Sequence, residues 1–455
     1  MAHGSFSRMA RAPSFKFVLV GFLVLLISGL LAIVWYTLSD RQNRALQVQE
    51  EVAQDWGGEQ RILGPYLIVP YSVRVKTGDA SKVVEFEDER LAIFLPDHFK
   101  AAADINTEVR HRAIYDVTVY RSQVALEGDF PAADLKIVDP EASHVRWQDA
   151  FIALGIRDVS GLKNNVVLSS GGRTIPFEPS IGVENPLAAQ MPGIHARLNL
   201  PPSEAANSSQ AISYKIDLAL NGSSSIKFAP VGRETAVSIK SNWPHPNFTG
   251  FLPLDREINP KGFSASWQIP HLARSVPQAW RERAQQPALD RFSNTDLGVR
   301  LFVPIDFYSL VDRALKYGFM FIASAFGGVF VMELLSARRV HPIQYIFVGL
   351  AIVMFYILLL SLAEHLGFVL AYVAASVATG GMISIYVGKA LQSLRRGVMM
   401  FGIFAILYTL LYLILQLEDY ALLAGAIAGF VLLTATMFAT LRVNWSGDDP
   451  QPYSP

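Results

Sequence analysis

Cysteine is missing from this chain of 455 residues, and charged residues are scarce. The absence of cysteine excludes disulfides, thiol nucleophiles and thiolate metal sites. Charged residues make up 17% of the chain, against about 25% in an ordinary soluble protein, and hydrophobic residues make up 51%. A substantial part of the chain is therefore expected to lie in lipid. Because 39 Lys and Arg balance 39 Asp and Glu, nothing indicates a nucleic-acid partner.

The chain also lacks the local motifs of common enzyme classes. It has no G-x-S-x-G elbow, no glycine-rich phosphate loop ending in Lys-Ser/Thr, no G-x-G-x-x-G and no H-E-x-x-H. The histidines between residues 37 and 316 do not have the short spacing of metal ligands, although a site assembled in space from distant ones stays open. We therefore predict no catalytic residue, no cofactor and no metal, and we expect that the chain is not an enzyme.

One apolar stretch, 342–363, sets the expected membrane topology. It has no charged side chain over about twenty residues, roughly what an α-helix needs to cross a hydrocarbon core of about 30 Å. Arg338 and Arg339 precede it, Pro342 suits a first helical turn, and Glu364 and His365 close it. Because cytoplasmic loops carry the excess of Lys and Arg, we predict a helix that starts in the cytoplasm and ends outside.

A second apolar run, 17–36, follows Arg8, Arg11 and Lys16 at the N-terminus. The run is longer than the usual core of a cleaved signal peptide and ends without a small-x-small cleavage site. The pattern predicts a retained first span, with the cytoplasmic N-terminus at 1–16 and the chain emerging outside at residue 37.

Further apolar runs near the C-terminus predict a bundle of five helices over 317–442. With the first span they give six spans, and both termini, including the tail 443–455, are expected in the cytoplasm. Arg395 and Arg396 are interpreted as part of an inside loop. The predicted spans of the bundle are 317–335, 343–363, 368–388, 398–417 and 421–441.

The region 37–316 contains no run long enough to cross a bilayer, so it is expected to form one large periplasmic insert between the first two spans. Residues 38–56 favour a juxtamembrane helix. Beyond them, apolar and polar residues alternate, which predicts half-buried strands in a mainly antiparallel β domain. Asn221 and Gly222 form a dipeptide typical of a hairpin turn. The alternating segments are 71–76, 213–220, 263–269 and 297–303.

Two groups of residues are candidates for interaction. Trp243, His245 and Phe248 lie around two prolines that would hold the backbone extended and present an amphipathic surface. The alternative is a strand-to-strand crossover in which the tryptophan plugs the edge of the sheet. Glu364 and His365 could titrate or dock against the insert, or they could be ordinary polar residues at a helix end.

Several motifs together resemble one bacterial family. The most specific are HPIQY, GLAIVMFY and AEHLGF within 338–368, and SNWPHPNF at 241–248 followed by GFLP. GPYLIVP at 64–70, DRALKY at 312–317 and the segment 263–267 support them. In these motifs the chain is similar to the inner-membrane protein family CreD. The resemblance implies a multi-pass inner-membrane protein with a large periplasmic region and a role in envelope integrity, and it supplies no catalytic residue.

The leading hypothesis is a non-enzymatic inner-membrane protein whose periplasmic β domain supports or monitors cell-envelope integrity. Its expected partners are the lipid bilayer and envelope components or other inner-membrane proteins, with the oligomeric state left open. The alternative is a transporter or a lipid-handling protein that uses the C-terminal bundle, and a periplasmic hydrolase is a third hypothesis. The predicted spans carry no ionisable residue near mid-depth, which argues against ion-coupled transport.

Overall fold

The computed structural model describes residues 13–77, 84–112, 115–182, 192–200, 211–281, 292, 295–301, 307–334, 340–417 and 420–441. The chain divides into two compact units. The helical unit comprises Met1–Leu46 and Ile305–Pro455, and the β unit comprises Gln47–Pro304.

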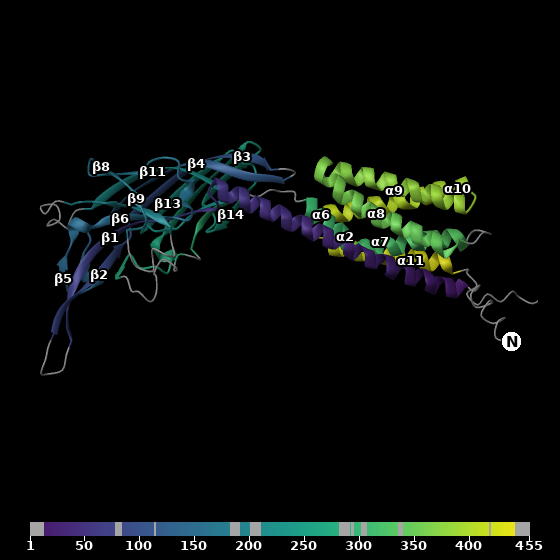
Figure 1. Cartoon of the computed structure of the whole chain (residues 1–455), viewed down its shortest axis with the longest axis horizontal. Coiled ribbons are helices and arrows are strands. Elements are labelled where there is room, and N and C mark those ends of the chain that lie inside the picture. The colour runs from purple at the N-terminus through teal and green to yellow at the C-terminus, as the bar shows by residue number, and fades with distance from the viewer. Residues whose placement is uncertain are drawn as a thin grey trace, which may run out of the picture. The chain divides into compact units, whose positions relative to one another are not determined.

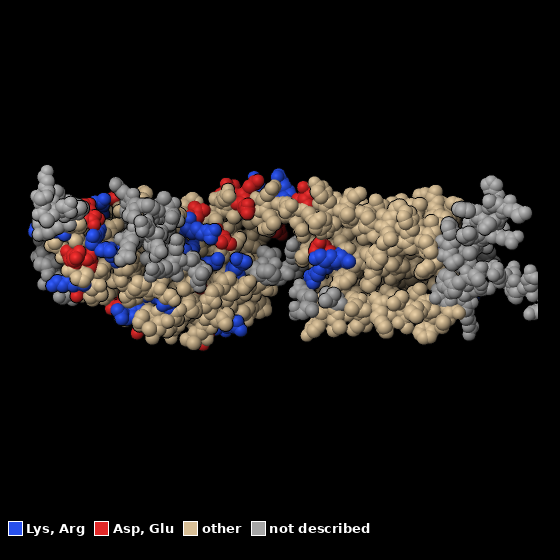
Figure 2. Space-filling view, turned by 90° about the horizontal axis from the view of Figure 1, so that it is seen from below, with Lys and Arg blue, Asp and Glu red and all other residues tan. Residues whose placement is uncertain are grey.

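Long apolar helices form the helical unit and run side by side (Figure 1). Their surface is almost free of charged side chains over most of its length, whereas the β unit carries charges of both signs (Figure 2). The helices are α2 (Pro13–Trp56), α6 (Phe307–Lys316), α7 (Gly318–Leu334), α8 (Pro342–Leu366), α9 (Phe368–Ala390), α10 (Leu394–Gln416) and α11 (Ala421–Thr440).

Four of the described helices, α2, α8, α9 and α10, are long and apolar enough to cross a membrane. The pair α6 and α7, bent by 52° at its break, gives a fifth if it counts as one span. The apolar part of α11, Leu423–Phe438, is shorter. The expectation of apolar spanning helices is confirmed, but six spans are not.

Local chemistry explains the start of α8. The His341 side chain accepts a hydrogen bond from the backbone of Ile343, and Gln344 bonds back to the backbone of His341, which completes a capping box. Pro342 occupies the first turn, as predicted, where its missing N–H costs no hydrogen bond.

Two expectations for the helices were wrong. Arg395 and Arg396 lie inside the first turn of α10, because that helix begins at Leu394 and the link after α9 contains only residues 391–393. The amphipathic helix α6 lies at the end of the expected β insert, but it belongs to the helical unit. Residues 38–56, by contrast, are helical as predicted, and they continue the first apolar run without a break as the 44-residue helix α2.

The β unit is built from two sheets. In sheet A the neighbouring strands follow the order β14-β18-β12-β1-β6-β10-β9. In addition, β2 and β5 pair with β1, and β17 pairs with β2. In sheet B the order is β15-β16-β13-β3-β4-β11-β7-β8. Among the described strands, the pairings of β1 with β12 and of β3 with β13 are parallel, and the others are antiparallel. The mainly-β, mainly antiparallel expectation is confirmed.

The strands of sheet A are β1 (Gln60–Thr77), β2 (Val84–Phe94), β5 (Ala142–Val145), β6 (Phe151–Ile156), β9 (Glu178–Pro179), β10 (Gly193–Arg197), β12 (Ser225–Phe228), β14 (Pro246–Gly250), β17 (Ala279–Arg281) and β18 (Leu297–Leu301). Those of sheet B are β3 (His98–Arg112), β4 (Tyr115–Phe130), β7 (Val167–Ser170), β8 (Arg173–Pro176), β11 (Ile212–Ser223), β13 (Glu234–Ser241), β15 (Asp255–Asn259) and β16 (Gly262–Pro270). Short helices connect them: α3 (Leu135–Val138), η1 (Trp147–Asp149), η2 (Val159–Gly161) and η3 (His271–Ala273).

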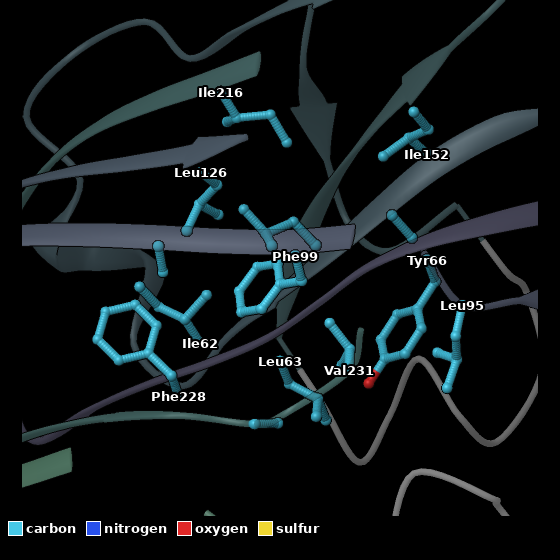
Figure 3. Packing of buried hydrophobic residues seen from close by; sticks show 14 of the residues in the cluster. Ile62, Leu63, Tyr66, Leu95, Phe99, Leu126, Ile152, Ile216, Phe228 and Val231 are labelled. Carbon is cyan, nitrogen blue, oxygen red and sulfur yellow. The ribbon is translucent and has the colours of Figure 1, made fainter. Parts of the chain in front are cut away.

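One hydrophobic core joins the two sheets. The predicted alternation holds in β11, where Tyr214, Ile216 and Leu218 are buried and the residues between them are exposed. Side chains of β1, β6 and β12 in sheet A meet side chains of β3, β4 and β11 in sheet B (Figure 3). Burial of this apolar surface is the main force that holds the two sheets together.

The hairpin predicted at Asn221 and Gly222 was wrong. Both residues lie inside β11, opposite Arg121 and Tyr120 of β4, and the chain then passes to β12 in the other sheet. The glycine is needed for a close approach, because a Cβ atom at Gly222 would collide with the ring and hydroxyl of Tyr120. The turn itself is made by Ser224, which adopts a φ of 59°.

Candidate functional site

Aromatic side chains fill the middle of the helical unit. The rings of Phe321, Phe355 and Phe404 surround Tyr408 at centroid distances of 4.8, 4.7 and 6.0 Å. The hydroxyl of Tyr372 donates to the backbone carbonyl oxygen of Tyr408 at 2.7 Å, so that this buried hydroxyl is satisfied. The rings pack closely against one another in the interior of the unit.

Glu333 is the one charged residue among the buried residues of the described part of the helical unit. It lies near the end of α7 and forms an ion pair with Lys16 at the start of α2. The hydroxyl of Tyr345 on α8 donates to its carboxylate at 2.9 Å. A buried carboxylate with a cation and a hydroxyl as partners is electrostatically compensated, so this cluster joins three helices at one end of the unit.

A second polar cluster surrounds Glu364, at the opposite end of α8. Its carboxylate accepts a hydrogen bond from the hydroxyl of Tyr308 on α6 at 3.3 Å and lies 3.7 Å from the guanidinium of Arg41 on α2. The next residue, His365, is exposed. The structure therefore brings Glu364 together with two other helices, and a titrating or docking role for Glu364 and His365 stays a prediction.

The basic residues from which the topology was predicted are only partly described by the structure. Lys16 lies in the Glu333 cluster, and Arg395 and Arg396 begin α10, with Arg395 exposed and Arg396 half-buried. The other four lie outside the described residues: Arg8, Arg11, Arg338 and Arg339.

The segment with Trp243, His245 and Phe248 connects the two sheets of the β unit. It leaves β13 in sheet B and enters β14 at the edge of sheet A. Phe248 packs edge-on against Phe263 and Trp267, with ring centroids 5.7 and 5.8 Å away, and Trp243 also contacts the core. His245 is exposed. This placement supports the strand-to-strand crossover, and an interaction role for the three residues stays a prediction.

Sequence reasoning missed a charged cluster around Asp139, whose side chain is 5% exposed. Asp139 follows α3, and its carboxylate accepts hydrogen bonds from Arg90 on β2 at 2.8 Å and from Arg281 on β17 at 3.2 Å. The hydroxyl of Tyr71 on β1 donates to it at 2.9 Å. Burial acts to raise the pKa of Asp139, but these donors and the backbone N–H of Glu141 outweigh it and lower the pKa. The cluster ties together three strands of sheet A.

Three described histidines of the β unit, His98, His111 and His195, have structural partners. His98 pairs with Asp129 at 2.9 Å, which raises the pKa of the imidazole. The ring of His195 lies 2.9 Å from the backbone carbonyl oxygen of Ser180. Among the residues that the structure describes, no three His, Asp or Glu side chains come together as a metal site would require.

Comparison with known proteins identifies the family. The model of the family "Inner membrane protein CreD" matches residues 12–446. The Inner membrane protein CreD of Escherichia coli (strain K12) is 30% identical to this chain over 423 residues, which cover 93% of this chain and 91% of the relative. The resemblance seen in the sequence motifs is confirmed. The apolar helices of this chain agree with the inner-membrane location that the family name gives. The chain belongs to the CreD family of inner membrane proteins.

Proposed function

We propose that this chain is a non-enzymatic inner-membrane protein whose β unit, in the periplasm, supports or monitors the integrity of the cell envelope. One observation carries the proposal, namely the aromatic packing inside the helical unit around Tyr408. A proton- or ion-coupled transport pathway usually needs ionisable groups inside the helix bundle. The described interior instead has close-packed rings, and its buried carboxylate, Glu333, is already paired at one end. The helices are therefore better suited to anchoring than to ion-coupled transport.

The proposal includes six spans, with both termini in the cytoplasm and residues 37–316 in the periplasm. The two polar clusters support the alternating direction of the helices. Lys16 at the start of α2 meets Glu333 at the end of α7, and Arg41, farther along α2, lies beside Glu364 at the end of α8. The start of α2 and the end of α7 therefore share one side, and the end of α8 lies on the other. Arg395 at the start of α10 fits an inside position because it is a cation next to an apolar span.

The topology can be tested by cysteine labelling, because the natural chain contains no cysteine. Ser160→Cys in the β unit and Ser393→Cys between α9 and α10 would be treated with a membrane-impermeant maleimide in intact spheroplasts. We expect labelling at residue 160 in intact spheroplasts and at residue 393 only after the membrane is permeabilised. The opposite pattern would contradict the proposed orientation.

The function can be tested by complementation of a strain whose own copy of the gene is deleted, scored as sensitivity to detergent. Residues 1–316 would be compared with the full chain, and immunoblots and protease resistance would establish that both reach the membrane folded and at equal levels. We expect that the tethered β unit restores resistance. If only the full chain does so, the C-terminal helices are needed for activity, and a transport or transmembrane signalling role replaces the proposal.

A further inference from the structure

A groove of about 670 Å³ runs between α9 and α10, and nothing in the proposed function uses it. Its floor is made of small, buried residues, Ser384 and Gly388 on α9 and Gly397 on α10. Its walls are exposed apolar side chains, such as Ile385 and Phe401. The volume lies within the range of about 300 to 1,000 Å³ that is typical of sites for small ligands.

Glycines create this groove. A Cβ atom on Gly388 would lie 2.9 Å from the Cα atom of Gly397, so the two helix backbones approach closely there. One and two turns before it on α9, Ser384 and Gly381 continue the same stripe. A Cβ atom on Gly381 would meet nothing within 4 Å, so the space above this residue is open. The two helices touch at the floor and leave an apolar trough toward the surface of the helical unit.

Positive charge gathers at one end of the trough. Lys389 and the polar link residues Gln392 and Ser393 line that end, and the exposed Arg395 lies in the next turn of the chain. Residues 368–416, which include both helices, contain Lys389, Arg395 and Arg396 and no Asp or Glu. The other end is lined by apolar side chains and Gly381. The trough is therefore apolar along its length and cationic at its mouth.

We propose that this groove binds one anionic phospholipid of the inner membrane. One acyl chain lies along the trough against Ile385 and Phe401, and the phosphate group lies at the mouth, paired with Lys389 and hydrogen-bonded by Ser393. The occupant is a lipid because a groove on the outer face of membrane helices is open to the acyl chains of the bilayer. Its headgroup is anionic because every charged side chain of α9 and α10 is a cation.

The binding test uses the full chain, purified in a neutral detergent and examined by native mass spectrometry. Phosphatidylglycerol and phosphatidylcholine with identical acyl chains are titrated in separate experiments. We expect one tightly bound phosphatidylglycerol for each chain, and at least tenfold weaker binding of phosphatidylcholine. Lys389→Gln should weaken phosphatidylglycerol binding roughly fivefold, or about 1 kcal/mol, and leave phosphatidylcholine unchanged.

A variant that fills the groove distinguishes binding at this site from general contact with lipids. Gly381→Leu places a side chain in the open trough and should abolish the tight phosphatidylglycerol site. Gly327→Leu on α7 is the matched control, since a Cβ atom there also meets nothing within 4 Å, but the residue does not line the groove. It should bind phosphatidylglycerol as the natural chain does. Thermal unfolding of each variant in detergent shows whether it is folded.

A second measurement needs no variant. Phosphatidylglycerol with a photoreactive group on its acyl chain should cross-link to the natural chain within residues 381–401. Equal affinity for the two lipids, equal loss in the Gly381 and Gly327 variants, or cross-links spread over all helices would each overturn the proposal. A dimeric mass that excludes bound lipid would also overturn it, because a second copy of the chain would then cover the groove.

Discussion

Replacing Asp139 by asparagine should lower the free energy of unfolding of the β unit by about 2 to 4 kcal/mol. One carboxylate oxygen, Oδ2, accepts from Arg90, Arg281 and Tyr71, and the other, Oδ1, accepts from the backbone N–H of Glu141. An asparagine has one acceptor oxygen, so its NH₂ group must face the donors on one side. The charge that compensates two arginines is also lost.

The magnitude follows from exposure. Removing one partner of a fully buried ion pair costs about 3 to 5 kcal/mol, because the other charge is left without compensation. Here the side chains of Arg90 and Arg281 are 20% and 31% exposed, so water can partly replace the carboxylate. The expected loss of unfolding free energy, about 2 to 4 kcal/mol, is therefore smaller than that for a fully buried pair.

The pH dependence has a definite sign. The pKa of Asp139 is lower in the folded chain than the unfolded value of about 3.9, so the folded state binds protons less readily. The stability that the charged carboxylate contributes is fully present above about pH 4 and is lost as the pH falls through the folded pKa. The difference between the natural chain and Asp139→Asn should be constant from about pH 5 to 8 and should narrow at lower pH.

Urea unfolding of the full chain in detergent micelles measures this loss. Tryptophan fluorescence reports mainly on the β unit, because five of the seven tryptophans lie within Gln47–Pro304. Asp116→Asn is the control, since Asp116 is 66% exposed in its pair with His111 and should change stability by no more than about 0.5 kcal/mol. Equal effects of the two variants at pH 7, or a difference that widens below pH 4, would refute the reasoning.

Three other substitutions test the contacts of Trp56 with two arginines and the Glu333 cluster. Trp56→Leu should lower the stability of the β unit by about 1 to 3 kcal/mol, measured by far-UV circular dichroism in urea, because the indole ring lies 4.6 Å from the guanidinium of Arg110 and 5.5 Å from that of Arg121. Lys16→Gln and Glu333→Gln should each lower the thermal stability of the chain in detergent. A double-mutant cycle should give a coupling of about 1 to 3 kcal/mol, and additive effects would contradict a compensated pair.

The sequence was most informative where one physical constraint acts alone. In lipid, an apolar run without charges can hydrogen-bond its backbone N–H and C=O groups only as a helix. The helix at 342–363 could therefore be predicted from the sequence. In a half-buried strand the period of two is equally direct, as in β11. The amphipathic helix α6 was missed because its charged residues, such as Asp312 and Lys316, interrupt the apolar run on which the spans were recognised.

The clusters of charged residues could not have been predicted, because their members are far apart in the chain. Arg90 and Asp139 are 49 residues apart, Arg281 and Asp139 are 142 residues apart, and the register of sheet A brings them together. Lys16 and Glu333 are 317 residues apart. The sequence showed the aromatic residues and prolines around Trp243. The contacts of these residues depend on how the two sheets pack together, which the sequence does not show.

The order of strands in sheet A places the beginning and the end of the β unit close together. The first strand starts at Gln60, opposite Ile226 of β12, which in turn lies opposite Val299 of the last strand, β18. Since neighbouring strands are about 4.8 Å apart, Gln60 and Val299 are separated by only about 10 Å. A domain whose two ends lie close together can be inserted into another chain without distorting that chain. The first and last strands of the β unit thus lie on either side of β12, as in a domain inserted into a host chain.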